Sequence, residues 1–303
     1  MALVIEALCE SGAGATLAQI FMVNPIFGGV AIARYGSEAM RRDLLPALIA
    51  GDIECCMALT EPDAGTNSLE LRTFAEAHGN GWRLNGRKIW ISAVPTADKM
   101  LVVARTRKVE ESQRRTDGIS LFLIDVEREG LTHSTIEKAG THCVPASNVY
   151  FEDTPVAGDE LIGTLHGGWK ELLDVLNTER IVTTAGLVGA VRLALGLAID
   201  YANDRRAKAE IECAAVMNHK AAALHDAGMP YGSQANMAKL IAAQAAAEGI
   251  ERAMQTMGGM GYAKETHLER LWRDARLFRF APVSEEMILN YIAVHDLGMA
   301  RGY

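Results

Sequence analysis

The sequence lacks the marks of a nucleic-acid-binding protein and of a membrane protein. Its 303 residues carry a net charge of −8, and no basic block stands out that could neutralise phosphates. No run of about 18 uninterrupted apolar residues indicates a membrane span. The N-terminus has no charged stretch before its apolar run and is not rich in Arg or Ser, so no signal or transit peptide is evident. We therefore expect no nucleic-acid partner and no membrane span.

Cysteine is scarce, and histidine shows no metal-binding spacing. There is no C-x-x-C pair, and the eight histidines form no H-E-x-x-H or similar pattern. We therefore expect no metal site. The cysteines are interpreted as buried thiols of a reducing compartment, not as a disulfide frame; they are Cys9, Cys55, Cys56, Cys143 and Cys213.

Apolar spacing divides the chain into helical and β-rich stretches. Residues 1–54 have helical spacing, and Ser37 followed by Glu38 is typical of a helix cap. Short β-branched runs follow at 100–104, 119–124 and 149–151. From Trp169 onward the sequence is Ala-rich with helical spacing again. We predict an α+β protein with a helical N-terminal part (1–54), a middle β-barrel or sandwich domain (55–160) and a C-terminal helical bundle (161–303).

Residues 57–66, Met-Ala-Leu-Thr-Glu-Pro-Asp-Ala-Gly-Thr, have the pattern of a strand that runs into a turn. Pro62 ends the apolar run, and the Asp63–Gly65 segment supplies turn chemistry. Such a loop exposes backbone N–H groups beside the hydroxyl of Thr66, which suits a phosphate or a ring carbonyl. An ordinary strand end is the alternative interpretation.

Residues 82–91 have the pattern of a hairpin. Asn85-Gly86 stands between Trp82–Leu84 and Lys88–Ile91, and Asn-Gly between alternating apolar residues is a strong hairpin signal. Taken alone, Asn-Gly is usually only a turn, and a Trp on a hairpin strand is usually part of the core.

In this order and spacing, the two segments resemble the flavin-binding middle domain of the acyl-CoA dehydrogenases. The resemblance continues along nearly the whole chain, most distinctively in Gln255-Thr-Met-Gly-Gly-Met-Gly-Tyr262 and Glu269-Arg-Leu-Trp-Arg-Asp-Ala-Arg276. It implies the fold of that family, FAD as the cofactor, and the conversion of an acyl-CoA thioester to a 2-enoyl-CoA.

Two departures from the family pattern stand out. The chain begins late, without the first N-terminal helices of the family. A second gap follows Asp204-Arg-Arg206, where the family continues with an Arg-x-Phe-Gly segment. That segment would have reached the FAD of a neighbouring subunit. Each gap would expose apolar surface that the family buries.

The resemblance assigns three groups of residues to FAD. The edge and turn around the flavin ring correspond to Met57, Leu59, Thr60, Gly65 and Thr66, and the segment beside the ring to Trp90, Ile91 and Ser92. Gln255 and Gly259 correspond to positions that touch a neighbouring subunit's FAD, which implies a homo-oligomer, a dimer or a tetramer. Ser284 is also included, although Ser284-Glu-Glu more simply caps the last helix.

The resemblance also implies a catalytic base, a carboxylate that removes the α-proton. In many family members it is a Glu in a Tyr-Glu-Gly-Thr turn, but that position here is Pro282, which has neither a carboxylate nor a backbone N–H. A subset, including isovaleryl-CoA and long-chain acyl-CoA dehydrogenases, carries the base at a position that matches Glu179. Burial beside an acyl pocket would raise the pKa of Glu179. A solvated Glu179-Arg180 pair near a helix start is the alternative.

The remaining substrate residues also follow from the resemblance. Arg180 corresponds to a family arginine near the substrate and base, with a structural ion pair as the alternative, and Thr66 is assigned to the substrate as well as to the flavin. Arg273 and Asp274 are interpreted as a helix-packing ion pair and not as a site.

The leading hypothesis is an FAD-dependent acyl-CoA dehydrogenase that passes electrons to an electron-transferring flavoprotein. A catalytically degenerate paralogue that acts as a binding or assembly protein is one alternative, favoured by the gaps and by Pro282. A flavin oxidase or monooxygenase on the same scaffold is another. The expected location is the cytoplasm, or the mitochondrial matrix if the source is eukaryotic.

Overall fold

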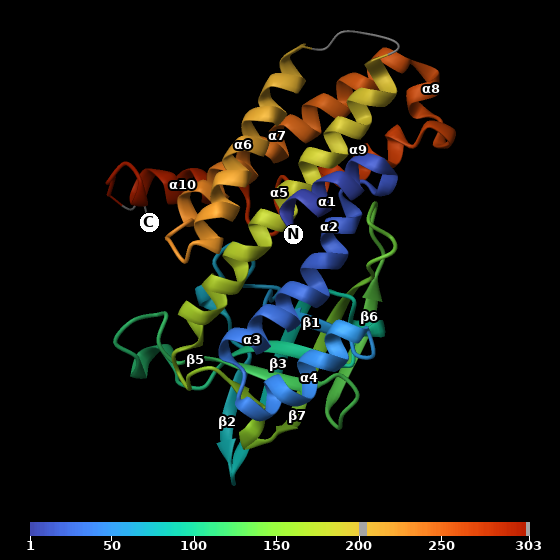
Figure 1. Ribbon diagram of the computed structural model, residues 1–303. Helices are drawn as coiled ribbons and strands as arrows, with labels where there is room; N and C mark the ends of the chain where they lie inside the picture. Colours follow the sequence, from blue (N-terminus) through green and yellow to red (C-terminus); the bar gives the residue numbers. More distant parts are fainter. Residues whose placement is uncertain (200–204, 301–303) are drawn as a thin grey trace. The chain divides into compact units, whose positions relative to one another are not determined.

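The computed structural model describes residues 1–199 and 205–300 (Figure 1). The contacts divide into two compact units: the first comprises Met1–Ile20, Ala139–His142 and Asn177–Tyr303, and the second comprises Phe21–Lys138 and Cys143–Leu176. The predicted gap follows Asp204-Arg-Arg206, and Asp204 lies outside the described residues. The division of the sequence into three parts, with boundaries at residues 54 and 160, stays a prediction.

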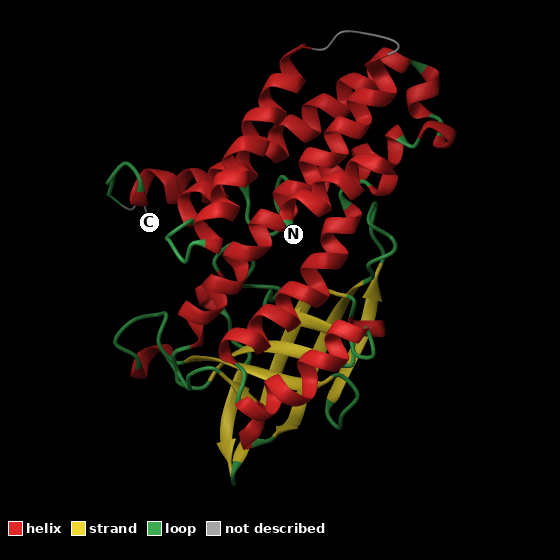
Figure 2. Cartoon of the chain, in the orientation of Figure 1, coloured by secondary structure: helices red, strands yellow, loops and turns green. Residues whose placement is uncertain are grey.

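The second unit contains the predicted β-structure. Its described strands form one eight-stranded sheet in the order β6-β7-β3-β2-β4-β5-β8, and β1 pairs with β4 in parallel. All the yellow strands of Figure 2 belong to this unit. The strands are β1 (Cys55–Ala58), β2 (Phe74–His78), β3 (Gly81–Ser92), β4 (Lys99–Arg105), β5 (Ile119–Asp125), β6 (Leu131–Ile136), β7 (Ala146–Val156) and β8 (Leu161–Ile162). Together with the helices before and after it in the sequence, this sheet confirms the predicted α+β fold.

Strands β4 and β5 are buried on both faces. Met100, Leu101 and Val102 are successive residues of β4, and none of them is exposed to solvent. Because neighbouring side chains of a strand point to opposite faces, both faces must be covered. This explains why the two segments are nearly continuous apolar runs without alternation.

The predicted hairpin turn at Asn85-Gly86 is wrong. Both residues lie inside the continuous strand β3, where Asn85 is paired with Phe74 of β2. The pairing of β3 with β7 changes register between Leu84 and Gly86, so the dipeptide forms a β-bulge. The side chain of Asn85 binds Asp153 of β7, with its amide nitrogen 2.9 Å from Oδ1.

The turn between β2 and β3 lies instead at Gly79-Asn80. Gly79 has a φ of 58°, a left-handed conformation that glycine adopts without strain. Gly-Asn is itself a hairpin signal, although a weaker one than Asn-Gly.

Helical segments precede the sheet within the second unit: η2 (Met22–Val30), α3 (Ala31–Tyr35) and α4 (Glu38–Ala50). The predicted cap of α4 is confirmed, because the Ser37 hydroxyl accepts a hydrogen bond from the backbone N–H of Met40 at 3.1 Å. The segment η2 packs on β1.

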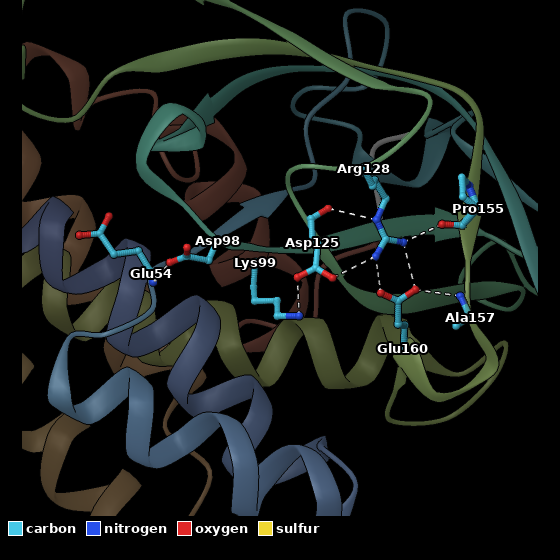
Figure 3. A network of polar contacts seen from close by, with 8 residues as sticks. All are labelled: Glu54, Asp98, Lys99, Asp125, Arg128, Pro155, Ala157 and Glu160. Atoms are coloured by element: carbon cyan, nitrogen blue, oxygen red, sulfur yellow. Dashed lines mark hydrogen bonds and ion pairs between the residues drawn. The ribbon is translucent and has the colours of Figure 1, made fainter.

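A polar network ties β4 and β5 to the end of β7 (Figure 3). The Arg128 guanidinium donates to the backbone carbonyl of Asp125 at 3.2 Å and to that of Pro155 at 2.6 Å. It also forms an ion pair with Glu160, while the Asp125 carboxylate contacts Lys99 at 2.5 Å. Arg128 therefore joins the end of β5 to the end of β7 and to Glu160, which follows β7.

The first unit is helical. Its helix α7 packs against α6, α9 and α10, and the core between them is rich in alanine, which lets the helices approach closely. The helices are α1 (Ala2–Leu8), most of α2 (Thr16–Phe21), α5 (Gly168–Ile199) from Asn177 onward, α6 (Arg205–Asp226), α7 (Gly232–Met257), α8 (Gly259–Tyr262), α9 (Leu268–Leu277) and α10 (Glu285–His295).

The cysteine prediction is only partly correct. Cys9, Cys55 and Cys56 are buried free thiols, as expected, but Cys143 and Cys213 are exposed. No group of side chains in the described parts of the chain could hold a metal ion.

Two helical segments are long and apolar enough for a membrane span by composition alone, Thr16–Tyr35 and Gly168–Ala198. The most apolar stretch of the second is 78% buried within the protein and that of the first is 56% buried. Core helices of water-soluble proteins meet the same criterion.

Candidate active site

A buried ion pair fixes the loop that follows β1. The Lys88 ammonium, with no exposed surface, lies 2.8 Å from the carboxylate of Glu61, which is 6% exposed. Lys88 also donates to the backbone carbonyl of Leu59 at 2.9 Å. The Glu61 carboxylate accepts the backbone N–H groups of Arg72 and Thr73 at 2.6 and 3.0 Å. The loop carrying Thr60 and Thr66 is thus held at its base by strand β3.

The ion pair stays charged near neutral pH. Burial lowers the pKa of Lys88 to about 8, although Glu61 opposes this shift. Burial alone would raise the pKa of Glu61, but Lys88 and the two backbone donors outweigh it and lower that pKa. Each charge therefore stabilises the other in a dry environment.

Trp90 stands out from β3 because of a second irregularity. The register with β7 shifts between Lys88 and Ile91, and Trp90 has a φ of 62°. Its indole is 53% exposed, whereas Ile91 points into the core at 2%. The backbone N–H of Ile89 donates to the carbonyl of Thr60 at 2.9 Å, so the Thr60 loop runs beside this strand.

These residues fit the predicted flavin face. A flavin ring needs a flat apolar surface and polar partners along its edge. The exposed indole of Trp90 is such a surface; Ser92 lies two residues further along the same strand, and Thr60 and Thr66 lie on the loop that follows β1. A Cβ built at Gly65 would meet no atom within 4 Å, so this turn is open. Met57 and Leu59 are half-buried on the same segment, and the assignment of these residues to FAD stays a prediction.

Glu179 lies in the interior of α5, on the part that belongs to the first unit. The helix begins at Gly168, so the alternative of a solvated pair near a helix start is wrong. Glu179 is only 2% exposed, and its Oε2 atom has no hydrogen-bond partner among the described residues. Burial raises the pKa of Glu179 to about 8, although Arg180 and Lys239 oppose the rise.

Arg180 adjoins Glu179 and is partly ordered by its own helix. Its guanidinium donates to the side-chain oxygen of Asn177, and its Nε has no partner among the described residues. Burial lowers the pKa of Arg180, and Glu179 opposes that shift.

Polar contacts hold the segment 279–285, which leads into α10. Lys239 of α7 has no exposed surface and donates to the backbone carbonyl of Val283 at 2.6 Å. Arg279 binds the carboxylate of Glu285 twice, at 2.6 and 2.9 Å. Pro282 is exposed between them.

Ser284 caps α10 as its pattern predicts, since its hydroxyl accepts from the backbone N–H of Met287 at 3.4 Å. A role for Ser284 in FAD binding stays a prediction.

The predicted pair of Arg273 and Asp274 is wrong in its partners. Arg273 binds Glu269 at 2.8 Å, one helical turn earlier. The Asp274 carboxylate, 2% exposed, accepts the Thr16 hydroxyl at 2.8 Å and the backbone N–H of Thr141 at 2.7 Å. Both residues are structural, as expected, but they serve different neighbours.

Gln255 and Gly259 lie at the exposed junction of α7 and α8. A Cβ at Gly259 would meet no atom within 4 Å. The junction is therefore open to solvent on this chain, and its contact with a neighbouring subunit's cofactor stays a prediction.

Comparison with known proteins identifies the family. Residues 56–154 match the middle domain of acyl-CoA dehydrogenases, and residues 166–295 match the C-terminal domain. The acyl-CoA dehydrogenase FadE12 of Mycobacterium tuberculosis is 33% identical across the whole chain, which covers 82% of that protein. The chain belongs to the acyl-CoA dehydrogenase family.

Comparison with solved structures agrees with this family. The butyryl-CoA dehydrogenase of Megasphaera elsdenii matches 95% of this chain, which covers 79% of that one, with a TM-score of 0.88 and 28% identity. The FAD complex of PigA matches 98% of this chain, which covers 82% of PigA, with a TM-score of 0.91 and 26% identity. The predictions of an oxidoreductase of this family and of FAD as its cofactor are confirmed.

Two buried lysines of this acyl-CoA dehydrogenase were not predicted, although each occupies an apolar position in the sequence. Lys88 falls between the apolar Leu84 and Ile91 of its strand, and Lys239 falls in the apolar stripe of α7 between Ala235 and Ala242. A lysine at such a position is buried only when paired. These two positions could have predicted that Lys88 and Lys239 each have a buried polar partner, but not which residue that partner is.

Proposed function

We propose that this acyl-CoA dehydrogenase removes the α-proton of an acyl-CoA thioester with Glu179, as a double bond forms between the α- and β-carbons. Two observations support this role: Glu179 is buried, and its Oε2 has no hydrogen-bond partner in the part of the chain that the structure describes. A buried carboxylate with a raised pKa holds a proton more strongly than one in water, which suits a base for a weakly acidic carbon. Bound FAD would supply the acceptor for the hydride that leaves the β-carbon.

The other residues orient and shield these groups. The Thr60–Thr66 loop and Trp90–Ser92 would hold FAD, with the Lys88–Glu61 pair fixing the loop. Arg180 would order the acyl pocket and keep a positive charge beside Glu179, without taking part in proton transfer.

The test uses purified protein, whose flavin absorbance reports both FAD binding and its reduction. Glu179→Gln should keep bound FAD but slow flavin reduction by acyl-CoA at least about 100-fold, because the amide cannot accept the proton. Glu171→Gln is a matched control on the same helix, because the Glu171 carboxylate already accepts the backbone N–H of Thr164 at 3.0 Å. It should reduce FAD at the normal rate.

Two results would redirect the proposal. Normal reduction in Glu179→Gln would point to another base. Wild-type protein that is purified without FAD and does not bind added FAD would favour the degenerate paralogue. A series of acyl-CoA chain lengths in the same assay would give the substrate preference.

The proposed electron acceptor is an electron-transferring flavoprotein. Reduced enzyme should pass electrons to that protein much faster than to O₂. The reverse preference would favour the oxidase alternative.

We also propose a homo-oligomer in which Gln255 and Gly259 serve a neighbour's FAD. A flavin-loaded monomer in sedimentation velocity would contradict it.

A further inference from the structure

Asp274 of α9 is a buried carboxylate that contacts the loop between β6 and β7. It is 2% exposed, and its Oδ1 accepts the backbone N–H of Thr141 at 2.7 Å. The neighbouring Arg273 donates to the backbone carbonyl of Ala139 at 2.7 Å. A Cβ built at Gly140 would lie 2.7 Å from the same Oδ1 and 3.2 Å from the backbone carbonyl of Arg273. Two adjacent residues of α9 therefore hold residues 139–141 of the loop at close range.

The same loop leads into the strand that pairs with the predicted flavin segment. Ala139–His142 belongs with α9 to the first unit, and the chain then continues into the second unit, where Pro145 precedes β7. The carbonyl of Pro145 accepts the backbone N–H of Ala93 at 2.7 Å. The next residue, Ala146, is the first of β7 and is paired with Ser92. The position of Pro145 therefore fixes the end of β3.

The end of β3 needs this support because its backbone is irregular. Trp90 and Ala93 have φ values of 62° and 63°, and the register with β7 shifts between Lys88 and Ile91. In the loop, Thr141 has a φ of 51°. A residue other than glycine keeps such a φ only where the surrounding structure holds it. Both segments therefore depend on contacts with other parts of the chain.

We propose that Asp274 is a positioning residue for FAD. By holding the loop at Thr141, it fixes the start of β7 and, through the bond from Ala93 to Pro145, the placement of Trp90 and Ser92. This inference rests on the proposed role of the Trp90–Ser92 segment in holding FAD.

Three substitutions separate the loop contact from the stability of the first unit. Asp274→Ala removes the acceptor of the Thr141 N–H. Gly140→Ala leaves Asp274 in place but forces the loop away from it, because the new Cβ has no room beside Oδ1. Thr16→Val is the matched control: it removes only the hydroxyl that donates to Asp274 Oδ2 at 2.8 Å, a bond that does not involve the loop.

Each purified protein is stripped of FAD and titrated with it, and the melting temperature is recorded. Asp274→Ala and Gly140→Ala should raise the dissociation constant of FAD about tenfold, because the flavin segment must then be ordered when FAD binds. The absorbance maximum of bound FAD should also shift, since Trp90 and Ser92 would no longer lie in their wild-type positions. Thr16→Val should lower the melting temperature but keep the wild-type dissociation constant and spectrum.

A wild-type dissociation constant and spectrum in both Asp274→Ala and Gly140→Ala would overturn the role of Asp274. An equal loss of FAD affinity in Thr16→Val would also overturn it, because lost stability would then account for the effect. If Asp274→Ala does not fold, Gly140→Ala decides.

Trp90→Ala distinguishes this failure from failure of the proposed flavin face. If Trp90→Ala weakens FAD binding while Asp274→Ala and Gly140→Ala do not, the face stands and the role of Asp274 falls. If Trp90→Ala binds FAD as the wild type does, the proposed flavin face itself fails, and the role of Asp274 fails with it.

Discussion

Lys88→Met should destabilise the second unit more than any surface substitution. The methionine fills most of the same space but removes both the cation beside Glu61 and the donor to Leu59. Breaking a buried pair leaves an uncompensated charge, which destabilises by about 3 to 5 kcal/mol. Because Glu61 keeps two backbone donors, at 2.6 and 3.0 Å, we expect the lower end, about 3 kcal/mol.

The assay is urea unfolding followed by a spectroscopic signal of the β-sheet. Lys99→Met is the matched control, since Lys99 is a lysine of the same sheet in a pair whose partner Asp125 is 51% exposed. A surface pair of that kind contributes about 0 to 1 kcal/mol. The double variant Lys88→Met/Glu61→Gln removes the stranded charge and should recover at least about 1 kcal/mol of the loss.

The same variant also tests the proposed flavin face. If the ion pair holds the loop in its binding conformation, Lys88→Met should weaken FAD binding about tenfold. This corresponds to a loss of about 1.4 kcal/mol of binding free energy. A loss of stability below about 1 kcal/mol, or no recovery in the double variant, would refute the reasoning from the ion pair.

Three further outcomes follow from the described geometry. The pKa of Glu179 rises from 4.5 to about 8 on folding, so this residue stabilises the protein below pH 4.5 and the effect is lost as pH rises to about 8; Glu179→Gln should flatten the fall in urea midpoint across this window, and an unchanged slope would contradict the shift. Gly86→Ala should destabilise by about 1 to 3 kcal/mol, because the new Cβ would lie 2.5 Å from a threonine hydroxyl, whereas Gly196→Ala, with no atom within 4 Å, should be neutral or stabilising; equal urea midpoints would argue against the bulge. A thiol reagent should modify Cys143 and Cys213 in the native protein and the three buried cysteines only after unfolding, and native modification of more than two thiols would contradict their burial.

The sequence predicted the elements of the fold well, because periodicity and caps are local signals. The strand near residues 100–104 appears as β4, and the Ser37 cap is made as expected. The hairpin at Asn85-Gly86 failed because a local turn signal was overridden by pairing with β7, which is far away in the sequence.

The site was harder to predict for the same reason. Lys88 and Lys239 bind carbonyls 29 and 44 residues away, and nothing local specifies those partners. The raised pKa of Glu179 could be anticipated from the family resemblance, but its burial depends on α5 starting at Gly168 and on the helices packed around it.

The hydrogen bond from Thr16 to Asp274 has a consequence for how the protein is made. It joins residues 258 positions apart, and the unit that contains Met1–Ile20 is completed only by helices from Asn177 onward. At about 5 to 20 residues per second, a ribosome needs tens of seconds to supply α9 after α2 has emerged. During that time the side chain of Ile5, fully buried in the folded protein, lacks its partners. Helices α1 and α2 must therefore remain soluble, or be protected by a chaperone, until α9 is synthesised.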